Sequence, residues 1–176
     1  MVIDKQLLLV KVDKNYCNFL RKFDEKVPYN FNDKETRPYI GILFKIDSLM
    51  YFAPLSSPKL KHLSLKSKLD FLKIDGGNLG VINFNNMIPV SRKNITLIDL
   101  NNDNSSILDT KYLNLLKKQI MWLNRNSGKI YSRAEKLYEK YNRNLLNESI
   151  RIRCCDFKLL EEKCIEYNKN FQAHTY

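Results

Sequence analysis

The hydrophobic pattern changes its period near residue 101, and this change limits the folds that the chain can adopt. Before that point, apolar runs such as "RPYIGILFKI" and "LMYFAPL" are short and separated by turn residues, which is typical of antiparallel strands. After it, Leu113, Leu116, Ile120 and Leu123 recur at helical spacing, which predicts a helix that packs through one face. The sequence therefore predicts a mixed α+β fold in which helices pack around a mostly antiparallel sheet.

Turn and capping residues mark the expected element boundaries. Asp13 follows an apolar run and is expected to cap a first helix. Turns at residues 47–48 and 75–78 predict two hairpins, the second because glycine supplies the positive φ that tight turns require. Residues 127–128 are expected to separate two of the later helices, and Asp156 is expected to cap the last one.

The length of the chain favours a single domain. Its 176 residues are enough to bury one core, with a β-rich body at about residues 1–100 and a helical part at about 107–170. No apolar segment approaches the length of a membrane span, and the N-terminus lacks a cleavable leader pattern, so we expect a soluble cytoplasmic protein without a membrane partner. The cysteines lack the paired spacing of metal sites and disulfide scaffolds, so reduced thiols and no bound metal are expected: Cys17, Cys154, Cys155 and Cys164.

The charge of the chain indicates an acidic partner. Thirty Lys and Arg residues against nineteen Asp and Glu residues give a formal net charge of +11. A small domain with such a balance has the electrostatic character of a nucleic-acid binder. A basic chain from a lysine- and asparagine-rich proteome would have the same composition without such a partner, so charge alone does not decide between the two.

The stretch "YFAPLSSPKLKH" at residues 51–62 carries the clearest candidate site. Its prolines remove ladder donors, so the chain must leave the sheet near Ser56 and Ser57 and present both hydroxyls at the end of a strand. Lys59 and Lys61 follow, and hydroxyl and ammonium donors on a rigid turn suit a phosphodiester. The alternative is structural, with serines that cap a turn and lysines that are simply solvated.

Four segments in this order resemble the ToxN/AbiQ family, the toxins of type III toxin-antitoxin and phage-abortive systems: "YCNFLRKFDEKVP", "RPYIGILFKI", "YFAPLSSPKLKH" and "GVINFNNMIPV". The resemblance covers roughly residues 6 to 100. It implies a strongly bent antiparallel sheet with a core related to the Kid/MazF barrel. It also implies a metal-independent, sequence-preferring endoribonuclease without cofactors that acts in abortive infection or plasmid maintenance. The implied partners are substrate RNA and a structured, repeat-derived antitoxin RNA in a protein–RNA hetero-oligomer.

The resemblance also implies roles for single residues. The serine-proline-lysine segment matches the active-site motif of the family, so Ser57 and Lys59 are expected to be catalytic, with Ser56 beside them. Tyr16 matches a tyrosine that relatives place near that motif and is expected to position substrate or relay a proton, although it also fits a core aromatic. His62 is either a general acid or base or a turn residue.

Metal-independent RNA cleavage uses the 2′-OH of the substrate as nucleophile, so the protein must hold the phosphate in line and stabilise its extra negative charge. Lys59 is the candidate for that stabilisation and Ser57 for orienting the phosphate. Other cations and aromatics are expected to bind RNA, although exposed helix faces are often lysine-rich without a partner. The expected RNA-binding residues are Tyr29, Lys34, Arg37, Ser56, Lys61, His62, Lys117, Lys118, Arg133 and Lys136.

Two other functions fit parts of the pattern. The chain could be a catalytically silent RNA-binding module of the same fold, which the serine-lysine motif disfavours. It could also be a DNA-binding regulator of its own promoter, which the lack of a recognisable helix-turn-helix disfavours. The asparagines of "GVINFNNMIPV", Asn83, Asn85 and Asn86, can read base edges or hold a turn.

Overall fold

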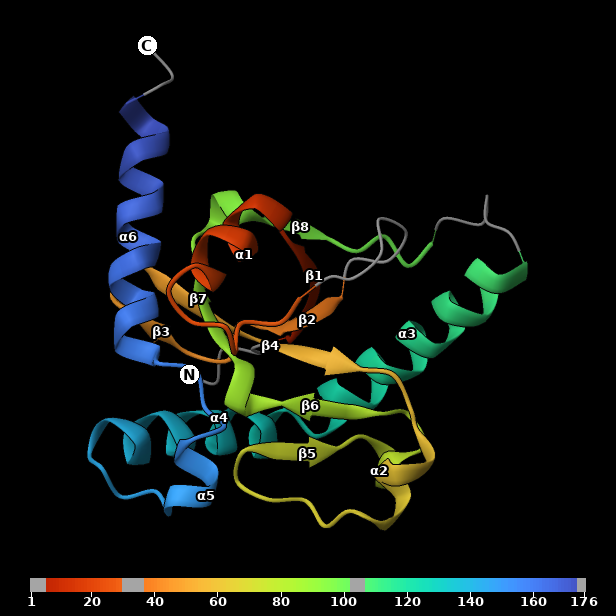
Figure 1. Ribbon diagram of the computed structural model, residues 1–176. Coiled ribbons are helices and arrows are strands. Elements are labelled where there is room, and N and C mark those ends of the chain that lie inside the picture. Colours follow the sequence, from red (N-terminus) through yellow and green to blue (C-terminus); the bar gives the residue numbers. More distant parts are fainter. Residues whose placement is uncertain (1–5, 30–36, 102–106, 174–176) are drawn as a thin grey trace, which may run out of the picture.

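The computed structural model describes residues 6–29, 37–101 and 107–173, whose strands form an eight-stranded antiparallel sheet (Figure 1). The strands are β1 (Leu8–Val12), β2 (Pro38–Gly41), β3 (Lys45–Ile46), β4 (Leu49–Ser56), β5 (Phe71–Lys73), β6 (Val81–Asn83), β7 (Ile88–Val90) and β8 (Ile95–Leu97). The α-helices are α1 (Lys14–Arg21), α2 (Leu60–Ser64), α3 (Ile107–Arg125), α4 (Ser127–Asn142), α5 (Glu148–Arg151) and α6 (Phe157–Ala173). Short 3-10 helices are η1 (Asp75–Gly77), η2 (Phe84–Asn86) and η3 (Arg92–Asn94).

Strand β4 organises the sheet because it exchanges partners along its length. Its first half pairs with β3 and β7, and its second half pairs with β2 and β6, with Ser56 opposite Val81. The main path runs β5-β6-β4-β2-β1-β8. Since β5 and β8 end this path, the described strands do not close, and the barrel core implied by the resemblance is not seen. The predicted α+β class with an antiparallel sheet is confirmed.

Several predicted boundaries are confirmed by side-chain caps and turns. The Asp13 carboxylate accepts a hydrogen bond from the Tyr16 backbone N–H at 2.8 Å and so caps α1. The Asp156 carboxylate does the same for the Leu159 N–H at 3.2 Å, at the start of α6. Residues 47–48 and 75–78 form the turns of the two hairpins, as expected.

Other expectations were wrong in detail. Ser127 and Gly128 lie in the first turn of α4 and not in a loop, because the chain turns at Asn126 just before them. The strand expected over residues 37–46 is divided into β2 and β3. Helices α2 and α5 were not predicted, because each has only about one turn and therefore shows no apolar repeat.

Helix α6 joins the sheet to the helical part of the chain. It packs beside α1 and β7 (Figure 1), and its buried Glu161 accepts hydrogen bonds from the hydroxyls of Tyr51 on β4 and Tyr138 on α4. These Oη–Oε1 distances are 2.8 and 2.5 Å. One carboxylate therefore ties three elements together. Among the described residues, no helix combines the length and apolar character that crossing a membrane requires.

Candidate active site

The candidate site is the turn that joins β4 to α2. Strand β4 is buried from Leu49 to Leu55, half-buried at Ser56, and ends there. Ser57, Pro58 and Lys59 are exposed between this strand and the first residue of α2. Proline fixes its own φ and has no N–H to extend the ladder, so it directs the chain out of the sheet. The sequence-predicted turn therefore exists and presents its side chains to solvent.

The first serine of the turn is held by the neighbouring hairpin. The Ser56 hydroxyl accepts a hydrogen bond of 2.9 Å from the Asn83 side-chain amide at the end of β6. This contact supports the turn-holding interpretation of Asn83, and the amides of Asn85 and Asn86 likewise donate to other parts of the chain. Ser57 differs from Ser56 because its side chain is exposed. The two hydroxyls thus divide into one that anchors the turn and one that faces solvent.

His62 anchors the other end of the turn. Its Nδ1 accepts a hydrogen bond of 3.2 Å from the Lys59 backbone N–H, so the neutral ring carries its proton on Nε2. The residue is only 4% exposed. Burial lowers the pKa of His62, and the charges of Lys61 and Lys59 lower it further. A neutral His62 fixes the backbone of Lys59, which is the role of a turn residue and not of a freely exposed base.

Two glycines allow the hairpin between β5 and β6 to approach the backbone of the turn and of α2 closely. A Cβ atom on Gly80 would lie 1.9 Å from the Ser56 carbonyl oxygen, and one on Gly77 would lie 2.8 Å from the carbonyl oxygen of His62. Both glycines have positive φ, 96° and 104°. In the sequence, Gly77 was expected only to form the hairpin turn at residues 75–78, and no role was predicted for Gly80. In the structure, that hairpin lies directly against the candidate site.

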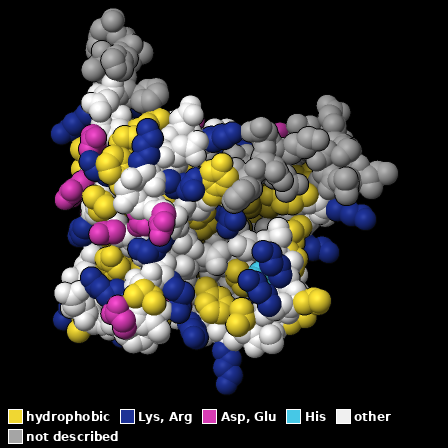
Figure 2. All heavy atoms as spheres, viewed as in Figure 1, with side chains coloured by type: hydrophobic (Ala, Val, Ile, Leu, Met, Phe, Trp, Pro, Cys, Tyr) yellow, Lys and Arg dark blue, Asp and Glu magenta, His cyan; other side chains and the backbone are white. Residues whose placement is uncertain are grey.

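The surface of the turn is strongly basic. Lys59 and Lys61 are exposed, and neither forms a salt bridge to a carboxylate within the described residues. Figure 2 shows dark blue Lys and Arg side chains gathered around the cyan His62. Leu60, 89% exposed between the two lysines, adds an apolar surface. The arrangement offers ammonium and hydroxyl donors to a phosphate and an apolar contact to a base.

Tyr16 lies in the core and not at this turn. It is fully buried, and its hydroxyl donates a 2.6 Å hydrogen bond to the Pro89 carbonyl. Pro89 pairs with Tyr51, and five strand residues at about 3.3 Å each put Ser56 about 17 Å farther along β4. Burial raises the pKa of Tyr16 well above its ordinary value. This placement supports the core interpretation, because the phenol reaches neither solvent nor the turn.

The expected RNA-binding residues are spread over several elements. Tyr29 is exposed and lies under the guanidinium of Arg21, 4.1 Å from ring centroid to Cζ. Arg37 is half-buried just before β2. Lys34 lies outside the described residues. The helical candidates are Lys117, half-buried, and Lys118, exposed, on α3, with Arg133, half-buried, and Lys136, exposed, on α4.

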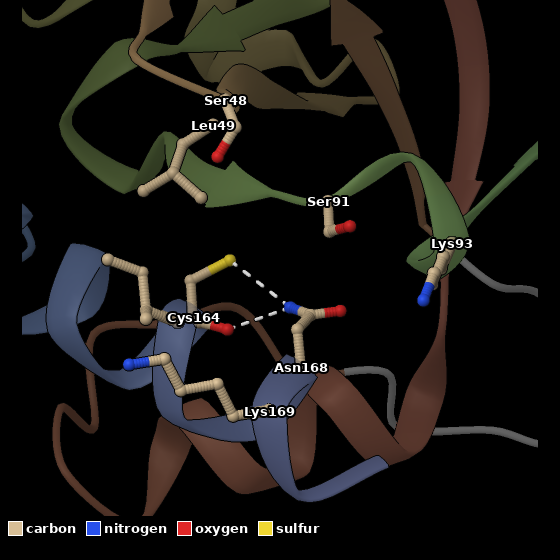
Figure 3. Close-up of a pocket in the computed structure, with 8 residues that line it drawn as sticks. Ser48, Leu49, Ser91, Lys93, Cys164, Asn168 and Lys169 are labelled. Atoms are coloured by element: carbon tan, nitrogen blue, oxygen red, sulfur yellow. Dashed lines mark hydrogen bonds between the residues drawn. The ribbon is translucent and has the colours of Figure 1, made fainter. Parts of the chain in front are cut away.

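A hollow of about 230 Å³ lies at the opposite end of β4 (Figure 3). It is bordered by Ser48 and Leu49, by Ser91 and Lys93 after β7, and by α6. Asn168 donates to the carbonyl of Cys164, and the side chain of Lys169 extends away from Asn168 (Figure 3). The two lysines that border the hollow, Lys93 and Lys169, therefore do not converge in it. No residue of the Ser57–Lys59 turn lines the hollow.

Within the described residues, no group of three or more His, Cys, Asp or Glu side chains is placed to hold a metal ion. All four cysteines are buried and unpaired with one another. Burial raises the pKa of the Cys17 and Cys154 thiols to about 12. Such thiols remain protonated near neutral pH, which fits packing residues and not nucleophiles.

The chain is an α+β protein in which one strand of an antiparallel sheet ends in a rigid basic turn that carries hydroxyl donors. Such a turn is suited to bind a phosphodiester. The chain belongs to the family described as "Toxin ToxN, type III toxin-antitoxin system", whose profile matches residues 8–165. It is 34% identical over 166 residues to Endoribonuclease ToxN of Bacillus thuringiensis subsp. kurstaki, covering 92% of this chain and 84% of that protein. It is 29% identical over 178 residues to Endoribonuclease AbiQ of Lactococcus lactis subsp. lactis, covering 96% and 93%.

Solved structures show the same relationship. A toxin of a bacterial type III system, selectively inhibited by a non-coding RNA pseudoknot, matches with a TM-score of 0.78 at 31% identity, covering 93% of this chain and 99% of its own. AbiQ, a lactococcal anti-phage endoribonuclease, matches with a TM-score of 0.78 at 27% identity and the same coverage. The family resemblance read from the sequence is therefore confirmed.

Proposed function

We propose that this chain is an endoribonuclease toxin of a type III toxin-antitoxin system. The observation that carries the proposal is the exposed Ser57–Lys59 segment, fixed at Ser56 by Asn83 and at Lys59 by His62. A turn held at both ends keeps its donors in place without reorganising when charge develops on a bound phosphate. Membership of a family whose relatives are named endoribonucleases supplies the reaction class.

The proposed reaction is an in-line attack by the substrate's 2′-OH on the adjacent phosphorus. The new O–P bond replaces the bond to the 5′-oxygen. The 2′-oxygen gives up its proton to solvent and the leaving 5′-oxygen takes one up from solvent, so the products are a 2′,3′-cyclic phosphate and a 5′-OH. Lys59 stabilises the charge that develops on the phosphate, and the Ser57 hydroxyl donates to a non-bridging oxygen. Ser56 and His62 hold the backbone that carries these two groups.

The proposed inhibitor is a structured antitoxin RNA that competes with substrate for this turn. A relative is selectively inhibited by a non-coding RNA pseudoknot, and a net charge of +11 exceeds what one scissile phosphate requires. We place this activity in the cytoplasm, where both RNAs would be available, and assign it to phage defence or plasmid maintenance, since the relative AbiQ is anti-phage. In this proposal, residues 1–176 form one endoribonuclease domain, which assembles with the antitoxin RNA into a protein–RNA hetero-oligomer.

The proposal is tested with Lys59→Ala and Ser57→Ala. Each should lower RNA cleavage on the order of 10²-fold or more, because each removes a group that acts in the transition state. Matched controls are Lys45→Ala and Ser48→Ala, which remove the same groups from exposed positions at the β3–β4 hairpin. Each purified protein, freed of bound RNA, is incubated with substrate RNA in excess EDTA, and the product ends are analysed for cyclic phosphate and 5′-OH.

Full cleavage by a folded Lys59→Ala variant would remove that residue from the mechanism. Products with 5′-phosphates would exclude attack by the 2′-OH. Tight RNA binding by the wild-type protein without any cleavage would instead identify a catalytically silent RNA-binding module.

A further inference from the structure

A second hollow, of about 350 Å³, lies between α4 and the segment that leads into β5. In Figure 1 this segment runs below the β5–β6 hairpin, and α4 lies behind the hairpin. Cations and hydroxyls form most of its lining, and none of the lining residues is acidic. The residues are Ser67, Lys68, Leu69, Lys129, Ser132, Arg133 and Lys136.

Arg133, on α4, connects the two sides of this hollow through hydrogen bonds to the segment that leads into β5. One guanidinium nitrogen donates to the backbone carbonyl of Lys68 and, at 3.2 Å, to that of Phe71. Partial burial lowers the pKa of Arg133, while the nearby Asp70 carboxylate raises it. That carboxylate is already engaged by Arg153, with N–O distances of 2.9 and 2.7 Å. Both contacts use Oδ2, while Oδ1 is buried without a hydrogen-bond partner among the described residues. Asp70 is itself buried and does not line the hollow.

The three lysines of the hollow have exposed side chains, and none is paired with a carboxylate in the part of the chain that the structure describes. Like charges that converge without counter-charges repel one another, and a bound anion removes this cost. Lys129 and Lys136 approach from α4, and Lys68 approaches from the opposite segment. The hollow is thus preorganised for a polyanion.

The hollow and the candidate active site share one piece of chain. Helix α2 follows the Ser57–Lys59 turn, and only a short segment separates His62 from Ser67. Five residues span at most about 18 Å, so the two places are near neighbours. Lys73 braces this segment, since its ammonium donates to the Leu63 carbonyl at 2.9 Å and its N–H donates to the Ser67 hydroxyl at 3.1 Å.

We propose that this hollow, formed by Lys68, Lys129, Arg133 and Lys136, binds backbone phosphates of the RNA strand that occupies the Ser57–Lys59 turn. The inference rests on the proposed function, and it adds a second contact that only an RNA longer than the scissile dinucleotide reaches. Lysine ammonium groups and serine hydroxyls are common donors to phosphate oxygens, and they carry no base preference. The site therefore contributes affinity and salt dependence but not sequence selection.

The test uses a fully 2′-O-methylated single-stranded RNA of mixed sequence and about 20 nucleotides, which cannot be cleaved. The wild-type chain is compared with Lys129→Ala/Lys136→Ala and with a control, Lys22→Ala/Lys45→Ala, of equal net charge. Both control lysines are exposed and lie outside the hollow. Losing two phosphate contacts should make the plot of log K against log salt shallower by about 1.4, and affinity at 0.1 M salt should fall about tenfold or more.

A second measurement does not depend on substitution. In the wild-type protein, the RNA should protect Lys68, Lys129 and Lys136 from acetylation, while Lys22 and Lys45 remain reactive. An unchanged slope in the double variant, equal losses in the control, or unprotected lysines would overturn the proposal. The proposal would also be overturned if pyrophosphate saturates the hollow while the RNA leaves its lysines unprotected from acetylation, because the site would then bind small anions. Since the probe cannot be cleaved, lysine protection with no nuclease activity would refute the proposed function and leave this site standing.

Discussion

Replacing Gly80 by alanine should disable the candidate site without unfolding the protein. The added Cβ would lie 1.9 Å from the Ser56 carbonyl oxygen and 3.1 Å from the carbonyl carbons of both Ser56 and Ser57. Real Cβ contacts are essentially never shorter than 3.0 Å, so the oxygen must retreat by about 1.1 Å, from 1.9 to 3.0 Å. The atoms that move belong to the backbone that carries Ser57.

The expected size of the effect follows from this displacement. A positive φ on a residue with a side chain costs about 1–3 kcal/mol, and overpacking costs about 1–3 kcal/mol more. Both costs together remain below the stability of many domains, about 5–15 kcal/mol. A misplacement of about 1 Å at a reacting group lowers turnover on the order of 10²-fold. Gly80→Ala should therefore fold cooperatively, melt at a lower temperature and cleave RNA about a hundredfold more slowly.

Gly76→Ala is the matched control. Gly76 lies in the same turn and also has a positive φ, 64°, but a Cβ there would meet nothing within 4 Å. It should cost stability through strain alone and leave cleavage near the wild-type rate. Single-turnover cleavage and thermal unfolding are measured on both variants. Wild-type cleavage by Gly80→Ala, or equal losses of cleavage in the two variants, would refute the idea that Gly80 positions the serine turn.

Two further variants separate packing from chemistry. Tyr16→Phe leaves the Pro89 carbonyl without its donor, so it should lower the free energy of unfolding by about 1–3 kcal/mol in denaturant titrations. RNA cleavage should stay within about threefold of the wild-type rate. A loss of cleavage of the order of 10²-fold in a stable variant would restore a catalytic role for Tyr16. His62 has a lowered pKa in the folded chain, so the unfolded chain binds more protons and stability should fall as the pH drops below about 6.5. His62→Asn should remove this part of the slope in thermal unfolding between pH 7.5 and 5.5, and parallel curves would contradict the assignment.

Local patterns were sufficient to predict most of the fold. The strand and helix periods, the Asp13 and Asp156 caps and the two hairpin turns depend on residues that are close in sequence. Strand β7 was not predicted, because its three residues include a proline and are too few to show alternation. The pairing of β7 with β4, and the open ends of the sheet at β5 and β8, depend on tertiary contacts that no local pattern encodes.

The sequence predicted the reactive groups of the candidate site and gave a turn-holding role as one alternative for His62 and Asn83, but it did not show which part of the turn each residue holds. Ser57 and Lys59 are visible as a motif because hydroxyls, prolines and lysines gather within a few positions. His62 supports the turn from three positions away, but Asn83 and Gly80 belong to a hairpin more than twenty positions away, and β6 lies beside β4 only in the folded sheet. Tyr16 shows the converse case: a motif match placed it near the turn, whereas the structure places its side chain in the core, and its catalytic role stays a prediction.

Under the two proposals above, an RNA that reaches both the Ser57–Lys59 turn and the hollow beside α4 should bind more tightly than a short RNA that reaches only the turn. The proposed cleavage needs one phosphate held against the Ser57–Lys59 turn, and this exposed turn gives a short RNA few contacts from which to gain affinity. An RNA that also reaches the hollow beside α4 adds phosphate contacts, and linked contacts strengthen binding far more than either one alone. Because Arg133 joins α4 to the segment that follows α2, an RNA bound there also holds the segment next to the turn. A short RNA that engages only the turn would then be displaced by a longer RNA that engages both places, and would not displace it.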